Sequence, residues 1–391
     1  MGPLQGVKVL DLTRVLAGPY CTMLLADFGA DVYKIETPGV GDDSRAFGPF
    51  IGKESAYYMS LNRNKRSMCM NMKDEKHKAV FIEMVKKADV VVENYRPGTM
   101  EKFGLGYDVL KEINPGIIYV ECSGFGRTGP YRLKPAYDVV VQAMGGIMSI
   151  TGAEGGEPTR VGASIGDVAA GLFSAIGCLM ALYHKQKTGE GQLVDVAMLD
   201  CQVAMLENAI ARYYTTGESP APIGNRHPSI TPFAAFPAKD GNVIIGCGNQ
   251  KLWVGMCELF NKPEWIDDPR FATNGDRTAN VKELMELMNE VTKTKTVDEW
   301  LPLLEAKGLP CAPINDMSRI TKDPSILERE MLVELEHPIA GKMTVPGCPI
   351  KMSATPGSIR KHAPLLGADI NEMLDDLLGW DEATIKEKMG L

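Results

Sequence analysis

The first part of the chain alternates short apolar runs with segments in which apolar residues recur at helical spacing. Such runs predict buried strands, and the amphipathic segments between them predict helices. Strands that alternate with helices favour a parallel sheet covered on both faces. We therefore expect an α/β fold with a parallel-sheet, Rossmann-like large domain. The predicted strands are 7–12, 30–36, 89–92 and 116–122, and the predicted helices are 21–28, 76–87 and 107–113.

The texture of the sequence changes at 216–232, where Pro, Gly and Ser accumulate and indicate a linker. Residues 1–215 then form the large domain. Residues 233–327 combine a hairpin with helical segments, which predicts a smaller α+β domain. The tail 328–391 offers only two strand-like pieces and two short helices. Because so little chain cannot bury its own core, we expect the tail to complete the large domain.

Composition excludes several classes of protein. The 391 residues carry 42 Lys and Arg against 50 Asp and Glu, a net charge of −8 that argues against nucleic-acid binding. We find no apolar run that approaches the length of a membrane span and no signal-peptide pattern at the amino terminus. The nine Cys include no C-x-x-C pair, and the five His form no ligand-spaced cluster. We therefore expect reduced cysteines, a cytoplasmic location and no metal site.

Polar residues follow the predicted strands, where ligands of parallel sheets bind. These strand ends carry Thr13-Arg14, Glu36-Thr37, Glu93–Arg96 and Ser123-Gly124. An acidic protein that binds a polyphosphate also needs a local group of phosphate partners. Each residue by itself is more commonly a solvated surface group, but several together near the strand ends favour such a site. The candidates are Asn64, Lys65, Arg66, Lys73, Arg96, Lys102, Arg127, Arg132 and Lys134.

A G-x-G-x-x-G string at 124–129 directly follows a predicted strand. In a dinucleotide site this string opens a helix whose amino end receives the pyrophosphate. Here Pro130 follows at once and Pro135 comes soon after, so no helix begins there. We interpret the string as a glycine-rich turn.

Asp167 opens the long apolar segment of the chain, which predicts a buried helix from Val168 to about His184. A carboxylate in the first turn of a helix faces unpaired backbone N–H groups and the positive end of the helix dipole. We expect this position to keep Asp167 ionised at neutral pH, as a nucleophilic carboxylate requires. The competing interpretation is an ordinary Asp that caps the helix.

Several strings, in their order and spacing, resemble the class III coenzyme A (CoA) transferases from about Gly6 to the end of the chain. None is decisive alone. Gly162-x-x-x-Gly166-Asp167-x-x-Ala170-Gly171 resembles the nucleophile motif of that family. The other strings are Arg14–Pro19, Leu25–Val32, Leu61–Ser67, Glu93–Gly98, Ser123–Gly126, Pro135–Asp138, Asp268–Phe271 and Ala363–Gly367.

The resemblance implies a covalent mechanism at Asp167. The carboxylate attacks an acyl-CoA thioester, and an aspartyl-CoA thioester then passes CoA to a free carboxylic acid. CoA is thus a co-substrate, no cofactor is tightly bound, and the family forms an interlocked homodimer. Tyr137 and Asp138 match positions that line the thioester. Implied CoA contacts are Leu16, Ala17, Thr37, Met70, Lys73, Asn94, Tyr95, Arg96 and Lys102.

Two departures bear on the substrate. Leu16 stands where formyl-CoA:oxalate transferase has Gln, which argues against that substrate pair. Gly224–Ser229 stands where formyl-CoA:oxalate transferase has a run of glycines that forms a mobile flap. Arg226 or His227 would therefore either meet the distal carboxylate of the acceptor or merely anchor a linker. The remaining segments resemble succinyl-CoA:dicarboxylate transferases and point to succinyl-CoA or a similar short-chain donor.

Two alternatives stay open. The α-methylacyl-CoA racemases share the fold and the aspartate, but they use a His as second base where this chain has Ala136, which cannot take a proton. A non-catalytic CoA-binding protein predicts loss of the acidic nucleophile, whereas Asp167 is present.

Overall fold

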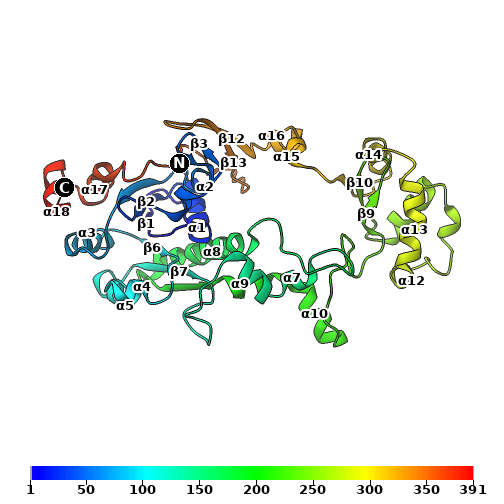
Figure 1. Cartoon of the computed structure of the whole chain (residues 1–391), viewed down its shortest axis with the longest axis horizontal. Helices are drawn as coiled ribbons and strands as arrows, with labels where there is room; N and C mark the ends of the chain where they lie inside the picture. Colours follow the sequence, from blue (N-terminus) through cyan, green and yellow to red (C-terminus); the bar gives the residue numbers. More distant parts are fainter. Residues whose placement is uncertain (1, 391) are drawn as a thin grey trace. The chain divides into compact units, whose positions relative to one another are not determined.

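The computed structural model describes residues 2–390, and its largest sheet has six parallel strands flanked by helices (Figure 1). The α/β prediction is thus confirmed for this sheet. Four of its strands match predicted ones, whereas the strands β5 and β8 at the two edges were not predicted. In spatial order the strands are β5 (Arg66–Cys69), β2 (Asp31–Glu36), β1 (Lys8–Asp11), β6 (Val90–Glu93), β7 (Ile118–Ser123) and β8 (Leu193–Ala197).

Helices cover both faces of the sheet, because successive strand residues point to opposite sides. Val9 and Val90 pack on one side with α1 (Ala17–Asp27) and α8 (Ile165–Thr188). The opposite side packs against helices that include two from the tail of the chain. Among these helices are α3 (Glu75–Val85), α5 (Tyr107–Ile113), α17 (Ile370–Leu378) and α18 (Glu382–Met389).

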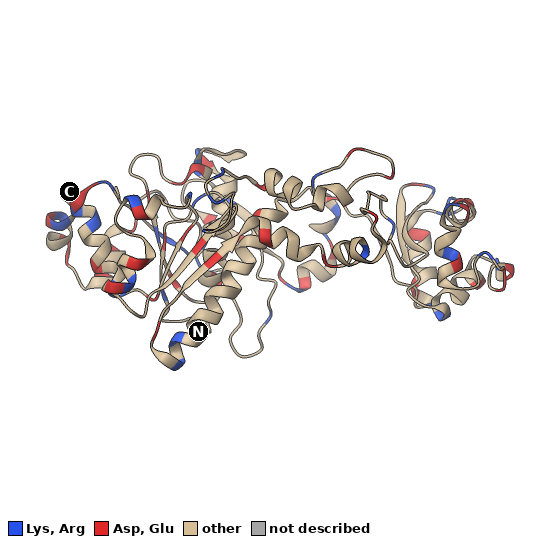
Figure 2. Cartoon of the chain, turned by 90° about the horizontal axis from the view of Figure 1, so that it is seen from below, with Lys and Arg blue, Asp and Glu red and all other residues tan. Residues whose placement is uncertain are grey.

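The chain divides into two compact units. Unit 1 holds residues up to 148, 160–214 and 324 onward, and unit 2 holds 149–159 and 215–323. The predicted domains placed 149–159 in the large domain, whereas here this segment belongs to unit 2. Figure 2 shows acidic and basic residues interspersed along the described chain.

Unit 2 has a core of its own, built around buried Phe236, Trp253 and Trp300. A three-stranded antiparallel sheet of order β11-β10-β9 packs against helices, and the predicted hairpin corresponds to β9 and β10. The elements are β9 (Phe233–Pro237), β10 (Asn242–Gly246), α11 (Gln250–Leu259), α12 (Asn274–Ala279), α13 (Val281–Thr292), α14 (Val297–Ala306) and β11 (Cys311–Pro313).

The remaining elements are short and connect or flank the layers already described. They are β3 (Phe50–Ile51), β4 (Glu54–Ser55), α2 (Ala56–Leu61), α4 (Thr99–Lys102), α6 (Asp138–Met144), α7 (Ile147–Ile150), α9 (Met198–Met205), α10 (Glu207–Thr216), α15 (Met317–Ile320), α16 (Pro324–Glu328), β12 (Leu332–His337) and β13 (Gly341–Pro346), with 3-10 turns at Asp43–Ala46 and Pro263–Trp265.

Helix α8 begins at Ile165, three residues before the predicted start, and ends where Gly189 adopts a left-handed conformation. Within residues 2–390 it is the one helix long and apolar enough to cross a membrane by length and composition. The prediction that no apolar run approaches that length is therefore wrong. The core helix of a soluble protein passes the same test, and α8 packs against α1 and β7.

A buried ion pair joins distant segments of unit 1. The Arg63 guanidinium donates to both carboxylate oxygens of Asp27, at 2.7–3.2 Å, and both residues are almost fully buried. The neighbouring Asn64 also donates to Asp27, and its own oxygen accepts from the backbone N–H groups of Arg360 and Lys361. The end of α1, the loop after α2 and the returning tail are thus held together.

We predict that Asp27→Ala destabilises unit 1 by about 3–5 kcal/mol, because it leaves a buried guanidinium without its partner. Urea unfolding followed by circular dichroism measures the loss. Lys342→Ala is the matched control, since it removes an exposed pair with Glu334 that contributes less than about 1 kcal/mol. Equal losses in the two variants would contradict the structural role of the buried pair.

Candidate functional site

A pocket of about 780 Å³ opens at the carboxyl ends of the central strands in unit 1. Three of the four predicted strand ends line it, through Arg14, Asn94–Arg96 and Ser123-Gly124. The sheet order reverses at β1, with β2 and β5 on one side and β6 to β8 on the other. Ligands of open α/β sheets bind at such a switch point. The pocket therefore lies where the sheet topology favours a ligand.

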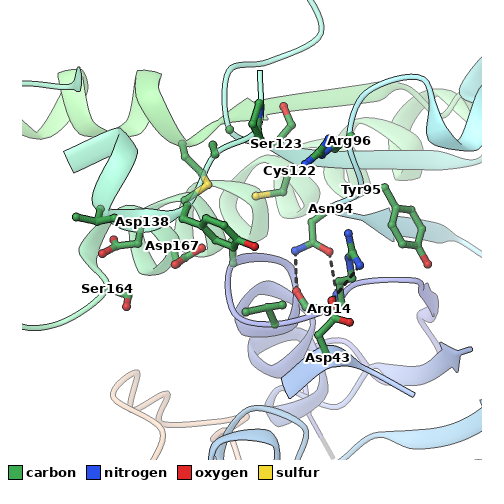
Figure 3. Close-up of a pocket in the computed structure, with 18 of the residues that line it drawn as sticks. Arg14, Asp43, Asn94, Tyr95, Arg96, Cys122, Ser123, Asp138, Ser164 and Asp167 are labelled. Carbon is green, nitrogen blue, oxygen red and sulfur yellow. Dashed lines mark hydrogen bonds and ion pairs between the residues drawn. The ribbon is translucent and has the colours of Figure 1, made fainter. Parts of the chain in front are cut away.

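The loop after β1 is strained and is held by side chains from other segments. Val15 adopts φ 67°, a left-handed conformation that is costly for a β-branched residue. The Asn94 side chain accepts from Arg14 N–H and donates to Arg14 C=O, both at 2.8 Å (Figure 3). Val15 N–H donates to Asp42 at 2.9 Å. These contacts fix the wall of the pocket at the amino end of α1.

Buried charges lie beneath this loop. Lys34 Nζ contacts Asp42 Oδ2 at 3.0 Å and donates to Thr13 C=O at 2.8 Å. Burial alone would raise the pKa of Asp42, but Lys34 and the N–H groups of Val15 and Ser44 outweigh it and hold this pKa at about 2. Asp42 therefore remains an anion that can hold the strained turn across the physiological pH range.

Several cations of the predicted phosphate cluster are engaged inside the protein. Lys65 is fully buried and pairs with Asp11 at 3.1 Å. Arg66 pairs with Asp376 at 2.7 Å, and Arg127 pairs with Glu121 and Glu101. Each of these three cations is therefore already paired with a carboxylate of unit 1, and their binding of phosphate stays a prediction.

Three other cations of that cluster line the pocket. Arg96 and Arg132 are exposed and form no ion pair within residues 2–390. Lys134 lies 4.0 Å from the centre of the Tyr131 ring. These side chains remain available for an anionic ligand.

The pocket brings together part of the set implied by the family resemblance. Leu16 and Met70 are buried outside the pocket lining, and Thr37, Lys73 and Lys102 are exposed away from it. The implied residues that line the pocket are Ala17, Asn94, Tyr95, Arg96, Tyr137, Asp138 and Asp167.

Asp167 is the third residue of α8, whose N-cap position is taken by Ser164. The interpretation of Asp167 as an ordinary cap is therefore wrong. The cap of this helix comes from another segment, because Gly166 N–H donates to Asp138 Oδ1 at 2.8 Å. A Cβ at Gly166 would lie only 2.7 Å from Val141 Cγ2, so the turn that carries Asp167 requires glycine.

The electrostatics of Asp167 differ from the prediction. No side chain or N–H group within residues 2–390 forms a hydrogen bond or an ion pair with its carboxylate. Burial and the charge of Asp138 raise the pKa of Asp167 to about 7. Near neutral pH this carboxylate is therefore only partly ionised, because desolvation and a like charge outweigh the modest effect of the helix dipole. A carboxylate of raised pKa is also the more basic nucleophile.

Arg226 and His227 belong to unit 2. Arg226 pairs with Glu154 at 2.7 Å. His227 Nδ1 accepts from Ser229 N–H at 3.1 Å, and its ring packs on Phe233. Both side chains are thus engaged with neighbours in their own unit.

Several pocket residues were missed from the sequence. Asp42, Asp43 and Tyr57 come from loops and a short helix that show no periodic pattern. Arg160 lies in the polar loop before Asp167, and its nearness in sequence to that residue was the available signal. Within residues 2–390 no three His, Cys, Asp or Glu side chains are grouped as metal ligands.

The G-x-G-x-x-G string at 124–129 lies in a loop and not at the start of a helix. Residues 124–137 form turns, and the next helix begins only at Asp138, so no helix amino end faces the G-x-G-x-x-G string. A Cβ on Gly124 would lie 2.2 Å from Ala136 Cβ. The interpretation as a glycine-rich turn is confirmed.

Comparison with known proteins gives a consistent result. The family model described as CoA-transferase family III matches residues 4–370. The chain is 43% identical over 387 residues to succinyl-CoA:glutarate CoA-transferase of Homo sapiens, covering 98% of this chain and 88% of that protein. It is 44% identical to succinyl-CoA:mesaconate CoA-transferase of Haloarcula marismortui, covering 96% of each. Acetyl-CoA:oxalate CoA-transferase of Acetobacter aceti is also 44% identical, with 90% of each chain covered.

A solved structure supports the same assignment. The crystal structure of a CAIB/BAIF family protein from Brucella suis matches with a TM-score of 0.85 and 38% identity, and it covers 96% of this chain and 99% of that one. The resemblance inferred from the short strings is thereby confirmed. The chain belongs to CoA-transferase family III and is a CoA-transferase.

Proposed function

We propose that this enzyme moves CoA from succinyl-CoA to a free dicarboxylic acid, with Asp167 as the covalent nucleophile. The observation that carries the proposal is an unpaired, partly buried carboxylate that lines the same pocket as several unpaired cations. In Figure 3 Asp167 and Asp138 lie at one end of the pocket, and Tyr95 and Arg96 lie at the other. The thioester of a bound acyl-CoA would reach the first end while its phosphates meet cations at the other.

The reaction balances without water or a redox partner. An Asp167 oxygen attacks the thioester carbonyl, the C–S bond breaks, and a mixed anhydride and CoA thiolate form. The thiolate then attacks the Asp167 carbonyl carbon and the anhydride C–O bond breaks. Succinate departs, and Asp167 is now an aspartyl-CoA thioester. The acceptor carboxylate attacks that thioester, and the released thiolate takes the acceptor acyl group. Asp167 is then a free carboxylate again.

Exclusion of water supports this sequence of steps, because the anhydride hydrolyses readily. Asp167 is poorly hydrated, and buried Cys122 and Met198 line the pocket with it. Apolar walls of this kind disfavour a water molecule beside the reactive carbonyl.

Arg160 is the side chain that we propose to select dicarboxylic acids. It lines the pocket on the loop leading to Asp167, and its guanidinium donates to Gly162 C=O at 2.7 Å. It has no carboxylate partner within residues 2–390, whereas Arg226 already pairs with Glu154. The relatives named above act on glutarate, mesaconate and oxalate, which all carry a second carboxylate. A guanidinium without a carboxylate partner is suited to bind that group.

We also propose a homodimer, interlocked as in the family, that acts in the cytoplasm. One face of α8 exposes a stripe of large apolar side chains at helical spacing. A stripe of this kind on a core helix is typical of a protein interface, since exposed apolar surface costs free energy in water. A second copy of the chain would cover Leu172, Phe173, Ile176, Leu179, Met180 and Tyr183.

We predict that Asp167→Asn and Asp167→Ala each lower kcat by at least about 10³-fold, because neither side chain can form the anhydride. The affinity for CoA, measured by calorimetry, should stay close to that of the wild type, because the phosphate partners are unchanged. Substantial turnover in either variant would contradict the assignment of the nucleophile.

A second prediction concerns the acceptor. Arg160→Gln should lower kcat/KM for glutarate by about 10- to 100-fold, the usual effect of losing a charge-assisted contact, and should leave kcat/KM for butyrate nearly unchanged. The matched control is Arg226→Gln, which removes the other candidate cation. If Arg226→Gln alone changes the ratio of glutarate to butyrate turnover, the selectivity belongs to the loop 224–229 instead.

A further inference from the structure

We propose that Asp138 is a positioning residue that holds the turn carrying Asp167 and makes its covalent modification favourable by like-charge repulsion. The inference rests on the proposed nucleophilic role of Asp167. It assigns to Asp138 a function that differs from contact with the substrate thioester.

The geometry ties Asp138 to the nucleophile turn through the backbone. Asp138 is the first residue of α6, and its Oδ1 accepts from Gly166 N–H, the residue directly before Asp167. Its Oδ2 accepts from Gln142 Nε2 at 2.7 Å, and Gln142 Oε1 accepts from Val161 N–H at 2.8 Å. One carboxylate thus organises both the start of α8 and the loop that leads into it.

The charge of Asp138 is not neutralised locally. It is buried, and no Lys, Arg or His within residues 2–390 forms an ion pair with it. Among the described residues, burial and then the charge of Asp138 raise the pKa of Asp167. The other titratable groups facing Asp167 are Tyr57 from α2 and Cys122 from β7, whose own raised pKa values keep them neutral near pH 7.

The consequence for the reaction follows from charge alone. The free enzyme carries two carboxylates at one end of the pocket, and their repulsion disfavours ionised Asp167. The anhydride and the aspartyl-CoA thioester are both neutral at Asp167, so either modification relieves the repulsion. Asp138 therefore makes Asp167 more basic and shifts the equilibrium toward the covalent enzyme.

The test uses Asp138→Asn, in which the remaining oxygen can still accept from Gly166 N–H. The rate of CoA adduct formation from succinyl-CoA is measured by rapid quench and intact-protein mass spectrometry across pH. Loss of the negative charge lowers the pKa of Asp167, so the acid limb of the profile should move to lower pH. At about pH 6 the variant should be faster than the wild type by up to about tenfold, since a carboxylate of pKa about 7 is only about one-tenth ionised there. On the alkaline plateau it should be slower, because a less basic carboxylate is a weaker nucleophile.

Gln142→Leu is the matched control, because it breaks the same side-chain hydrogen bond and keeps the charge of Asp138. Whatever the rate at which its adduct forms, its acid limb should stay where the wild-type limb lies. An unshifted limb in Asp138→Asn, or equal shifts in both variants, would show that Asp138 acts only as a structural cap. Absence of any adduct in the wild type would instead overturn the proposed nucleophile.

Discussion

The approach of α8 to the amino end of α1 is the constraint on which the site depends. A Cβ at Gly171 would lie 2.7 Å from Ala17 C=O, so the two helices reach this distance only because residue 171 has no side chain. One turn earlier the same helix carries Asp167, and the pocket wall opposite begins at Ala17. The close packing therefore sets the nucleophile directly beside the strained loop after β1. The exposed face of α8 carries the stripe of large apolar side chains that we propose a second copy of the chain covers.

Charged side chains lie at both ends of the pocket. Asp167 and Asp138, which have no cationic partner within residues 2–390, lie at one end, and Arg96, which has no carboxylate partner there, lies at the other. A CoA thioester also has its charge at one end, because its negatively charged phosphates lie far from its acyl group. Asn94 and Asp42 hold the pocket wall through hydrogen bonds with Arg14 and Val15, and the buried Lys34 keeps Asp42 ionised. The buried charges thus organise the backbone of the site.

The sequence predicted the parallel sheet and the location of the pocket, because apolar runs and strand ends are local signals. It missed the edge strands β5, which carries Arg66 and Ser67, and β8, where Asp195 interrupts an apolar run. It did not predict that Lys65, Arg66 and Arg127 pair with carboxylates of the same unit, since a cation in a loop looks the same in sequence whether it faces solvent or a carboxylate. The raised pKa of Asp167 could not be predicted, because it results from burial in the folded pocket and from Asp138, which the fold brings from a separate helix. The pairing and the burial of a charged side chain depend on residues that are distant in sequence, so the local sequence pattern does not predict them.

The most direct test of the covalent mechanism follows an oxygen atom. The enzyme is incubated with succinyl-CoA and with succinate labelled with heavy oxygen in its carboxylates, so that donor and acceptor are the same acid. Attack by the labelled acid on the aspartyl thioester, followed by release of its acyl group to CoA, leaves a labelled oxygen on the aspartate. Peptide mass spectrometry should therefore find heavy oxygen on Asp167 and on no other carboxylate. Turnover that leaves Asp167 unlabelled would contradict the account, because CoA would then pass between the acids without a bond to the enzyme.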